Sequence, residues 1–306
     1  MSHPRAAKII LGFAVVYLVW GSTYLAIRIG VQHLPPALFA GVRFLVAGVL
    51  MLAYARWTGA GWPAGRQDWR NITVTALLML VCGNGLVTWS EQWVESNQAA
   101  LIVATSALWL AWVGTWGRQG EGLGPVTIAG LVFGFAGVAV LVGGGIRMQA
   151  APPMAYGGLM LAPMAWAAGS VWSRRQPTSC PPAMTAALQT LIAGVVLSAL
   201  GLSLGELPRW NWNREAMLAL AYLVVFGSFL AYGAYFWLVH QVSPARLGTY
   251  AYVNPAVAVL LGWWILDEHL DRTQVLGTLV ILAGVLLVSW PTPKPKTVTA
   301  ENSDSH

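Results

Sequence analysis

Apolar residues in this chain form long blocks that are separated by short polar breaks. The first block begins near Ile9 and ends at Gly30, and the later blocks are of similar length. A helix rises about 1.5 Å per residue, so about 20 residues cross a hydrocarbon core about 30 Å thick. The predicted spans are 9–29, 37–56, 72–90, 98–116, 125–144, 154–174, 183–204, 215–239, 246–266 and 272–290. The pattern therefore predicts an all-α membrane protein with ten transmembrane helices.

Composition agrees with this prediction. Of the 306 residues, 57% are hydrophobic and 9% are charged, whereas a soluble domain carries about 25% charged residues. The net charge is +6, but the positive residues are spread through the loops and not gathered in one patch. We therefore interpret the basic balance as membrane topology and predict no nucleic-acid partner. The expected partners are the lipid bilayer and a small-molecule substrate, and the expected oligomer is a monomer or homodimer.

Lys and Arg residues are concentrated in alternate loops. If the N-terminus lies in the cytoplasm, the cytoplasmic side holds Arg5, Lys8, Arg56, Arg66, Arg70, Arg118, Arg174, Arg175, Arg246, Lys294 and Lys296. The opposite side holds Arg28, Arg147, Arg209, Arg214 and Arg272. Cytoplasmic loops of membrane proteins carry the excess of positive residues. This bias predicts that both termini are cytoplasmic.

The sequence also repeats. GLVFGFAGVAVLV (130–142) matches GTLVILAGVLLVS (277–289), and VWGSTYLAIR (19–28) has a weaker match in AWAAGSVWSRR (165–175). We predict two five-helix repeats, 1–148 and 149–290, and a disordered cytoplasmic tail at 291–306. Because five is odd, the second repeat enters the membrane from the opposite side, which gives the inverted repeat of many secondary transporters. Gly130 and Gly134 predict close packing of the fifth helix.

Five stretches in order carry a family resemblance. They are WGSTYLAIRIG (20–30), LPPALFAGVRFLVAG (34–48), GNGLVTWSEQ (83–92), YLVVFGSFLAYGAYFWLV (222–239) and VSPARLGTYAYVNPAVAVLLG (242–262). The chain resembles the EamA-type ten-helix exporters of the drug/metabolite transporter (DMT) superfamily, in particular their YedA-like branch. The resemblance implies a bacterial inner-membrane exporter of small metabolites, often amino acids. In one departure, Ala107 stands where relatives often have a proline matching Pro255, which predicts a stiffer fourth helix.

The first helix carries a polar stripe. Trp20, Tyr24 and Arg28 are four residues apart and share one helix face. A polar stripe that faces lipid is costly, so this face should point into the bundle or an aqueous cavity. Arg28 lies near the outer end of the helix. It is therefore explained either as an interface anchor or ion-pair partner, or as a substrate-facing cation.

Arg43 lies deeper, about 10 Å from the outer end of the second helix at 1.5 Å per residue. A central Arg costs at least about 2.5 kcal/mol on insertion scales, so it needs a partner or water. One explanation is an ion pair with a carboxylate on the same side, such as Glu91, Glu95, Asp267 or Glu268. The other explanation is that the planar guanidinium group of Arg43 binds the carboxylate of an amino-acid-like substrate.

Similar stripes recur in helices three, six, eight and nine. Any single stripe is also explained by helix–helix hydrogen bonding, but several in matching helices favour a central cavity. The predicted substrate-binding residues are Trp20, Tyr24, Arg28, Arg43, Asn84, Thr88, Trp109, Trp166, Ser170, Tyr232, Tyr235, Tyr250 and Asn254. Glu91 and Glu95 are candidates for coupling or an ion pair, and Pro163 and Pro255 for kinks that serve gating.

The sequence has no P-loop, paired metal ligands or nucleophile elbow. We therefore expect neither an enzyme nor a resident cofactor or metal. The favoured function is export of amino acids or related zwitterions or anions by alternating access. The alternatives left open are a multidrug or hydrophobic-compound exporter of the same fold and a membrane scaffold or sensor without transport.

Overall fold

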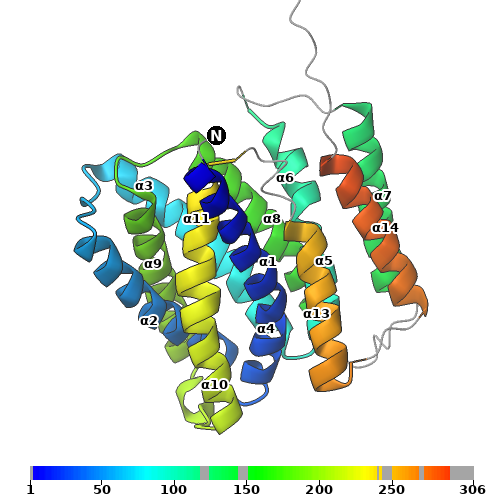
Figure 1. Cartoon of the computed structure of the whole chain (residues 1–306). Coiled ribbons are helices and arrows are strands. Elements are labelled where there is room, and N and C mark those ends of the chain that lie inside the picture. Colours follow the sequence, from blue (N-terminus) through cyan, green and yellow to red (C-terminus); the bar gives the residue numbers. More distant parts are fainter. Residues whose placement is uncertain are drawn as a thin grey trace, which may run out of the picture.

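The computed structural model describes residues 3–117, 124–143, 151–239, 241–242, 250–268 and 272–289. These residues form helices and turns without strands, so the predicted all-helical fold is confirmed over this part of the chain (Figure 1). The helices are α1 (His3–Val31), α2 (Pro36–Trp57), α3 (Arg66–Thr75), α4 (Gly85–Ser90), α5 (Ser96–Val103), α6 (Ser106–Gly114), α7 (Pro125–Gly143), α8 (Pro153–Arg175), α9 (Pro182–Ser203), α10 (Arg214–Tyr222), α11 (Gly233–Val239), α13 (Tyr250–Leu266) and α14 (Arg272–Ser289). The predicted tail, 291–306, lies outside the described residues.

Six helical stretches in the described part of the chain are long and apolar enough to cross a membrane. They are Arg5–Val31, Pro36–Trp57, Arg66–Ser90, Ser96–Gly114, Pro182–Ser203 and Arg214–Val239. Shorter apolar helices cover Pro125–Gly137, Val253–Leu266 and Val275–Gly284. A count of ten spanning helices therefore stays a prediction.

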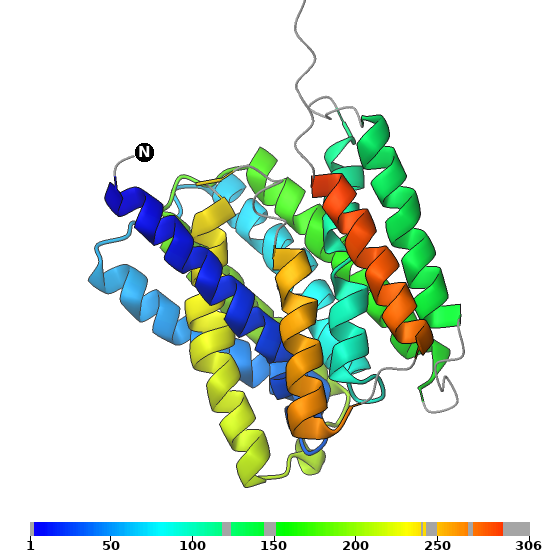
Figure 2. The ribbon, with the colours of Figure 1, turned by 45° about the vertical axis from the view of Figure 1, so that its right-hand side comes forward.

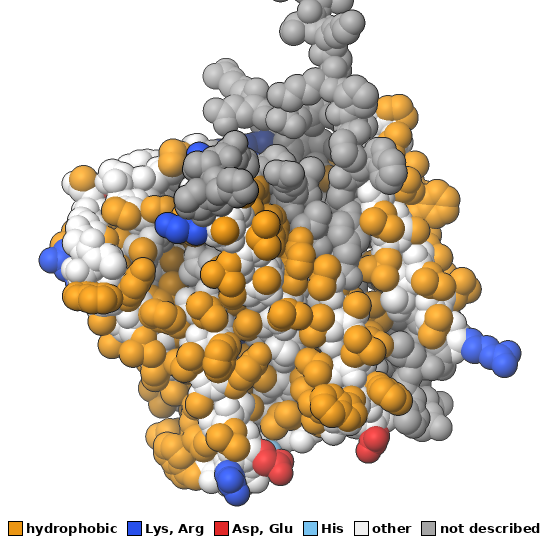
Figure 3. All heavy atoms as spheres, viewed as in Figure 1, with side chains coloured by type: hydrophobic (Ala, Val, Ile, Leu, Met, Phe, Trp, Pro, Cys, Tyr) orange, Lys and Arg blue, Asp and Glu red, His pale blue; other side chains and the backbone are white. Residues whose placement is uncertain are grey.

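The molecular surface has the distribution of side chains that a bilayer requires. In Figure 3, hydrophobic side chains cover most of the described surface on this face, and the few charged side chains lie at its edges and near its top and bottom. Leu260, Trp263 and Trp264 of α13 are all exposed on this apolar exterior. Large apolar side chains outside and polar side chains inside are expected when lipid is the surrounding solvent.

Prolines begin several helices. Pro36, Pro153 and Pro182 each occupy the first position of α2, α8 and α9. The first N–H groups of a helix have no partner within it, so a residue without an N–H is tolerated there. In this way the Pro-Pro pairs of the sequence fix where these three helices start.

Glycines bring two pairs of helices into close contact. Helix α7 packs along α14, side by side in Figures 1 and 2, and α2 packs along α9. A Cβ added to Gly284 would lie 2.4 Å from the backbone nitrogen of Gly134. One added to Gly41 of α2 would lie 2.6 Å from the nitrogen of Ser198 in α9. These backbones therefore approach as closely as small residues allow.

Two helices change to π-helical geometry at the middle of the molecule. The first π-helical segment, Ala76–Asn84, joins α3 to α4, and the second, Leu223–Tyr232, joins α10 to α11. Runs of π-helix are rare and are often found at functional sites. Both segments pack against α2 or its neighbours. They bring unusual backbone geometry to the centre of the bundle from both halves of the sequence.

The fourth predicted span, 98–116, is not one regular helix, and its stiffness stays a prediction. A turn at Ala104 and Thr105 breaks it into α5 and α6, although Ala107 replaces the expected proline. Thr105 contributes to the break, because its hydroxyl bonds back to the carbonyl of Ile102 at 2.6 Å. Pro255, in contrast, lies inside the continuous helix α13. The hydrogen bond of Thr105 to the backbone therefore accompanies a break in the helix close to the place where relatives often have a proline.

Two buried glutamates bind the N-termini of helices. Glu206 accepts the backbone N–H of Leu38 at 2.8 Å and that of Ala37 at 3.4 Å at the start of α2. Glu268 accepts the N–H groups of Ser96 and Asn97 at the start of α5. Each carboxylate satisfies N–H groups without helical partners and faces the positive end of the helix dipole.

We expect Glu206→Ala to lower the free energy of unfolding by about 1 kcal/mol, the usual effect of removing an N-terminal cap. The measurement is thermal unfolding of the purified protein in detergent. Glu215→Ala, which changes an exposed glutamate of α10, is the matched control. Equal melting temperatures for the two variants would contradict this role of Glu206.

Candidate functional site

A central cavity lies between α1, α2, α8, α13 and the two broken helices α3–α4 and α5–α6. It contains about 580 Å³ of empty space, including the open space at its mouth. The lining residues are Trp20, Thr23, Tyr24, Ile27, Arg43, Gly83, Asn84, Val87, Val103, Ser106, Ala162, Pro163, Trp166, Tyr250 and Asn254. Among these, Arg43 is the one charged residue.

Arg43 joins the two π-helical segments across the cavity. Its Nε donates to Ser228 Oγ at 2.8 Å in the second segment, and its Nη1 donates to Asn84 Oδ1 at 3.2 Å in the first. The side chain is 3% exposed, and its guanidinium carbon lies 4.9 Å from the ring centre of Phe44. Both hydrogen-bond acceptors are neutral, so neither balances the positive charge. The geometry differs from the predicted ion pair with a glutamate.

Aromatic rings close one side of the cavity. Trp20 contacts Trp166, Tyr235 and Tyr250 with ring centres 4.8–5.6 Å apart, and Trp166 also contacts Tyr232. Such distances and the tilted or edge-on geometries are those of favourable aromatic pairs. We call these five residues the aromatic layer. The indole of Trp20 is fixed further because its Nε1 donates to the carbonyl of Gly227 at 3.3 Å.

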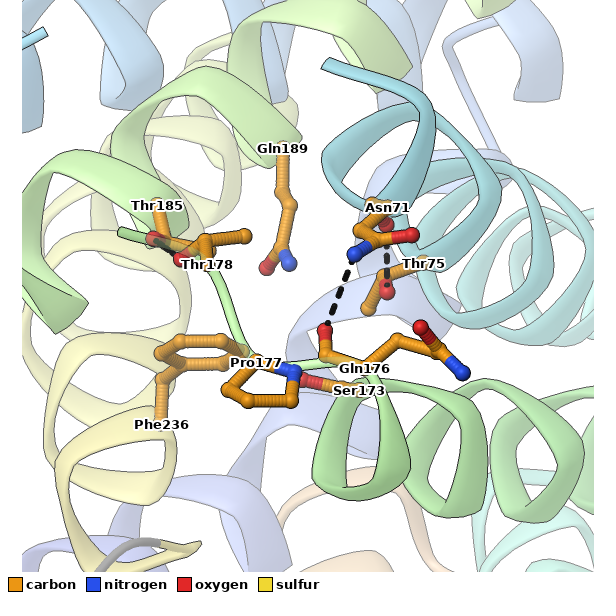
Figure 4. Close-up of a pocket in the computed structure, with 9 residues that line it drawn as sticks. All are labelled: Asn71, Thr75, Ser173, Gln176, Pro177, Thr178, Thr185, Gln189 and Phe236. Carbon is orange, nitrogen blue, oxygen red and sulfur yellow. Dashed lines mark hydrogen bonds between the residues drawn. The ribbon is translucent and has the colours of Figure 1, made fainter. Parts of the chain in front are cut away.

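A second, smaller pocket lies beyond the aromatic layer. It encloses about 220 Å³ including its mouth, and polar side chains from α3, α8 and α9 converge on it (Figure 4). The lining residues are Asn71, Thr75, Ser173, Gln176, Pro177, Thr178, Thr185, Gln189 and Phe236. Gln189 accepts a hydrogen bond from the Tyr232 hydroxyl at 2.6 Å. That bond connects the polar pocket to the aromatic layer.

The turn between α4 and α5 begins at Glu91, one helical turn after Val87, which lines the cavity. We call this the Glu91 end of the bundle. Arg28 of α1 donates from Nη1 to the backbone carbonyl of Glu91, which ties the first helix to this turn. The Glu91 side chain is buried.

The predicted residues fall into three groups. Those that line the central cavity are Trp20, Tyr24, Arg43, Asn84, Trp166, Tyr250, Asn254 and Pro163. Those on or next to the aromatic layer are Ser170, Tyr232 and Tyr235. Those away from the cavity lining are Arg28, Thr88, Trp109, Glu91, Glu95 and Pro255.

Three of the residues away from the lining have other contacts. The Thr88 hydroxyl bonds back to the carbonyl of Asn84 at 2.9 Å. Trp109 packs on Phe135 of α7 with ring centres 4.8 Å apart. Glu95 accepts a hydrogen bond from Gln98 at 3.3 Å. Their roles in binding or coupling remain predictions, and their contacts are those of structural residues.

Several lining residues were absent from the prediction. Thr23, Gly83 and Ser106 line the cavity, and Ser228 holds Arg43 although it does not line the cavity. Ser106 shares a hydrogen bond of 3.2 Å with the Tyr250 hydroxyl. Thr23 and Ser106 are short polar residues in apolar helices, and that pattern was the available signal. Gly83 has no such signal because its place in the wall depends on the π-helical geometry.

The described residues hold no group of three or more His, Cys, Asp or Glu side chains that could bind a metal. The two cysteines, Cys82 and Cys180, are free thiols. The site instead offers one buried guanidinium, neutral hydrogen-bonding groups and aromatic faces. Such a set can bind and orient an organic molecule that has a carboxylate and an apolar body.

Comparisons with known proteins agree with this picture. Residues 7–143 and 153–290 match the model of the EamA-like transporter family. The chain is 40% identical over 279 residues to the uncharacterized inner membrane transporter YedA of Escherichia coli K12, which covers 90% of this chain and 88% of YedA. It is 22% identical to the uncharacterized transporter YoaV of Bacillus subtilis, over 92% of this chain and 96% of YoaV.

Two further matches extend the comparison. The chloroplastic WAT1-related protein At3g02690 of Arabidopsis thaliana is 26% identical, over 90% of this chain and 68% of that protein. A solved crystal structure with 21% identity superposes with a TM-score of 0.69 and covers 92% of this chain and 97% of its own. At that identity the structural match shows a shared fold.

Proposed function

The chain belongs to the EamA-like transporter family, and from this premise we propose that it exports amino acids or related zwitterions and anions across the inner membrane by alternating access. That it is a membrane transporter and not an enzyme follows from its family and its relatives. The substrate class, the direction and the mechanism are the proposal. The location at the inner membrane is carried over from the name of the Escherichia coli relative.

The observation that carries the proposal is the setting of Arg43. A guanidinium that is buried, faces a cavity and bonds to neutral Ser228 and Asn84 has no carboxylate among its hydrogen-bond partners in the described residues. A guanidinium holds a carboxylate through two parallel hydrogen bonds. Two of its N–H groups are used by Ser228 and Asn84, and five are available in all. A substrate carboxylate in the cavity therefore finds both charge and donors.

The rest of the cavity wall supports a substrate with an apolar body. Trp20, Tyr24, Trp166 and Tyr250 present aromatic surface, and Asn254 and Ser106 add neutral polar groups. Aromatic faces stabilise both apolar side chains and ammonium groups. An amino acid combines a carboxylate, an ammonium group and a side chain, so each of its parts has a partner of suitable chemistry in this wall.

Packing within the bundle supports alternating access. Helix α1 packs on α10 and α11, and α8 packs correspondingly on α3 and α4. The pairs α2–α9 and α7–α14 join equivalent helices of the two predicted repeats, 1–148 and 149–290. This is the arrangement expected of two halves related by an approximate two-fold axis, which can rock about a central site. In the predicted orientation the Glu91 end faces outward.

The second candidate is an exporter of hydrophobic or cationic compounds. It is favoured by the aromatic share of the cavity wall, where Trp20, Trp166 and Tyr250 lie together. In that case Arg43 is a structural link between the π-helical segments, and a carboxylate adds nothing to binding. Ligands that differ only in their charged groups therefore separate the two candidates.

The test is ligand-induced stabilisation of the purified protein. Three matched compounds are leucine, isopentylamine, which lacks the carboxylate, and 4-methylpentanoate, which lacks the ammonium group. A ligand at ten times its Kd stabilises the folded protein by about 1.4 kcal/mol. We expect leucine and 4-methylpentanoate to raise the melting temperature and isopentylamine to leave it unchanged. Stabilisation by isopentylamine and by a cationic dye, without an effect of the carboxylates, would establish the second candidate instead.

A further inference from the structure

Glu91 is a buried acid that the proposed binding site does not use. It is the first residue after the span Arg66–Ser90, and its side chain is 0% exposed. Neither carboxyl oxygen has a hydrogen-bond partner among the described residues. Burying an ionised carboxylate without donors is strongly unfavourable. In this arrangement Glu91 is therefore not expected to be an ionised carboxylate without hydrogen-bond donors.

The charged and titratable neighbours of Glu91 come from three parts of the chain. Arg28 and Tyr24 lie on α1, Arg43 lies on α2, and Glu268 follows α13. Burial is the largest effect and raises the pKa of Glu91 well above its ordinary value. The positive charges of Arg28 and Arg43 oppose this rise, and the negative charge of Glu268 adds to it. The balance favours the neutral acid.

The neighbouring carboxyl groups of Glu91 and Glu268 also differ in the hydrogen bonds that they accept. Glu268 accepts bonds from the N–H and hydroxyl of Ser96 and the N–H of Asn97, at 2.9–3.1 Å. These donors lie at the N-terminus of α5 and satisfy the carboxyl oxygens of Glu268. Glu91 receives no such donors, because Arg28 donates to its backbone carbonyl and not to its carboxyl group. Unlike Glu268, Glu91 is thus a buried carboxyl group whose oxygens accept no hydrogen bond from the described residues.

We propose that Glu91 is a proton-binding site, occupied while the Glu91 end of the bundle is closed and vacated when that end opens. On opening, the carboxyl O–H bond breaks, the proton passes to a water molecule, and the carboxylate is left hydrated beside Arg28. Water can reach it because Val87, one turn earlier, already lines the central cavity. The positive charges of Arg28 and Arg43 disfavour a metal cation at the same place.

The first test needs no substrate. Infrared spectra of the reconstituted full-length protein at pH 8 report protonated carboxyl groups through their carbonyl band. Ordinary glutamates, with a pKa of about 4.3, are ionised at this pH. We expect a band in the wild-type protein that is lost in Glu91→Gln and kept in Glu95→Gln, the matched change in the same turn. A wild-type spectrum without the band, or a band that survives Glu91→Gln, would overturn the proposal.

The second test rests on the proposed function and uses leucine exchange in proteoliposomes. Because the closed form holds a proton that the open form releases, raising the pH favours opening, by up to about tenfold per pH unit for one proton. We expect exchange by the wild-type protein to rise between pH 6 and pH 8. Exchange by Glu91→Gln should be slow and independent of pH, and Glu95→Gln should behave as wild type. A pH-dependent Glu91→Gln would contradict the proton site.

The two tests separate this inference from the proposed function. If leucine is not exchanged by any variant, the substrate proposal fails, and the infrared band still decides whether Glu91 carries a proton. If leucine is exchanged but the band is absent, the proposed substrate is supported and the proposed proton-binding site at Glu91 is contradicted. Melting temperatures of the variants show whether each retains the native fold, and the wild-type spectrum alone is decisive if Glu91→Gln does not fold.

Discussion

Arg43→Gln is expected to weaken leucine binding by about 10- to 100-fold, because hydrogen bonds to a charged group contribute about 1.5–3 kcal/mol. Glutamine keeps a polar side chain that can reach one of the two acceptors, Ser228 or Asn84, but it lacks the positive charge. Isopentylamine, without a carboxylate, should show no measurable binding to either protein. Equilibrium binding of the labelled ligands to detergent-purified protein measures the affinity of each protein for leucine.

Arg28→Gln is the matched control for this experiment. Arg28 lies near the same end of the bundle, but it donates to a backbone carbonyl and does not line the cavity. Its replacement should leave the affinity for leucine within about twofold of wild type, because it removes no contact with the substrate. If Arg28→Gln and Arg43→Gln weaken leucine binding equally, Arg43 has no special contact with the carboxylate, and its role is structural.

The second large effect is expected at the contact of α7 with α14. Gly284→Val places a side chain where a Cβ would lie 2.4 Å from the backbone nitrogen of Gly134, so the two helices must separate. Overpacking of this kind costs about 3 kcal/mol or more when the obstacle is backbone. We expect a strongly lowered melting temperature and loss of the monodisperse peak in size-exclusion chromatography.

Gly157→Val is the control for helix propensity. Gly157 lies in α8 with open space around its Cβ position, so valine meets no obstacle there. Both changes replace a helical glycine by the same β-branched residue, and they therefore share the intrinsic effect on helix formation. A melting temperature lowered as much by Gly157→Val as by Gly284→Val would show that the α7–α14 contact tolerates a side chain.

Helix positions and the general location of the cavity could be predicted from the sequence because both depend on simple periodicities. Blocks of about 20 apolar residues gave the helices, and Pro36 and Pro182 marked helix starts. The four-residue spacing of Trp20 and Tyr24 placed both on the cavity wall. An isolated charge in an apolar helix pointed to Arg43 because lipid cannot solvate it.

The failures share a physical cause, which is backbone geometry that side-chain spacing does not reveal. Ser228, Tyr232 and Tyr235 share a face on a regular helix. Ser228 and Tyr232 lie in the π-helical segment, where Ser228 bonds to Arg43 and Tyr232 to Gln189; Tyr235 follows in α11 and contacts Trp20. A π-helix has more residues per turn, so it rotates the following side chains away from the expected face.

The aromatic layer has a consequence for the electrical insulation of the membrane. A chain of waters or hydroxyl groups that reaches from one face to the other would conduct protons and dissipate the membrane potential. Here the rings of Trp20 and Trp166 line the central cavity and pack edge-on with their centres 5.4 Å apart. The hydroxyls of Tyr232 and Tyr235 bond to Gln189 and Ser170. The Trp20 and Trp166 rings make no hydrogen bond to each other, so we expect their contact to interrupt such a wire and the resting transporter not to leak protons.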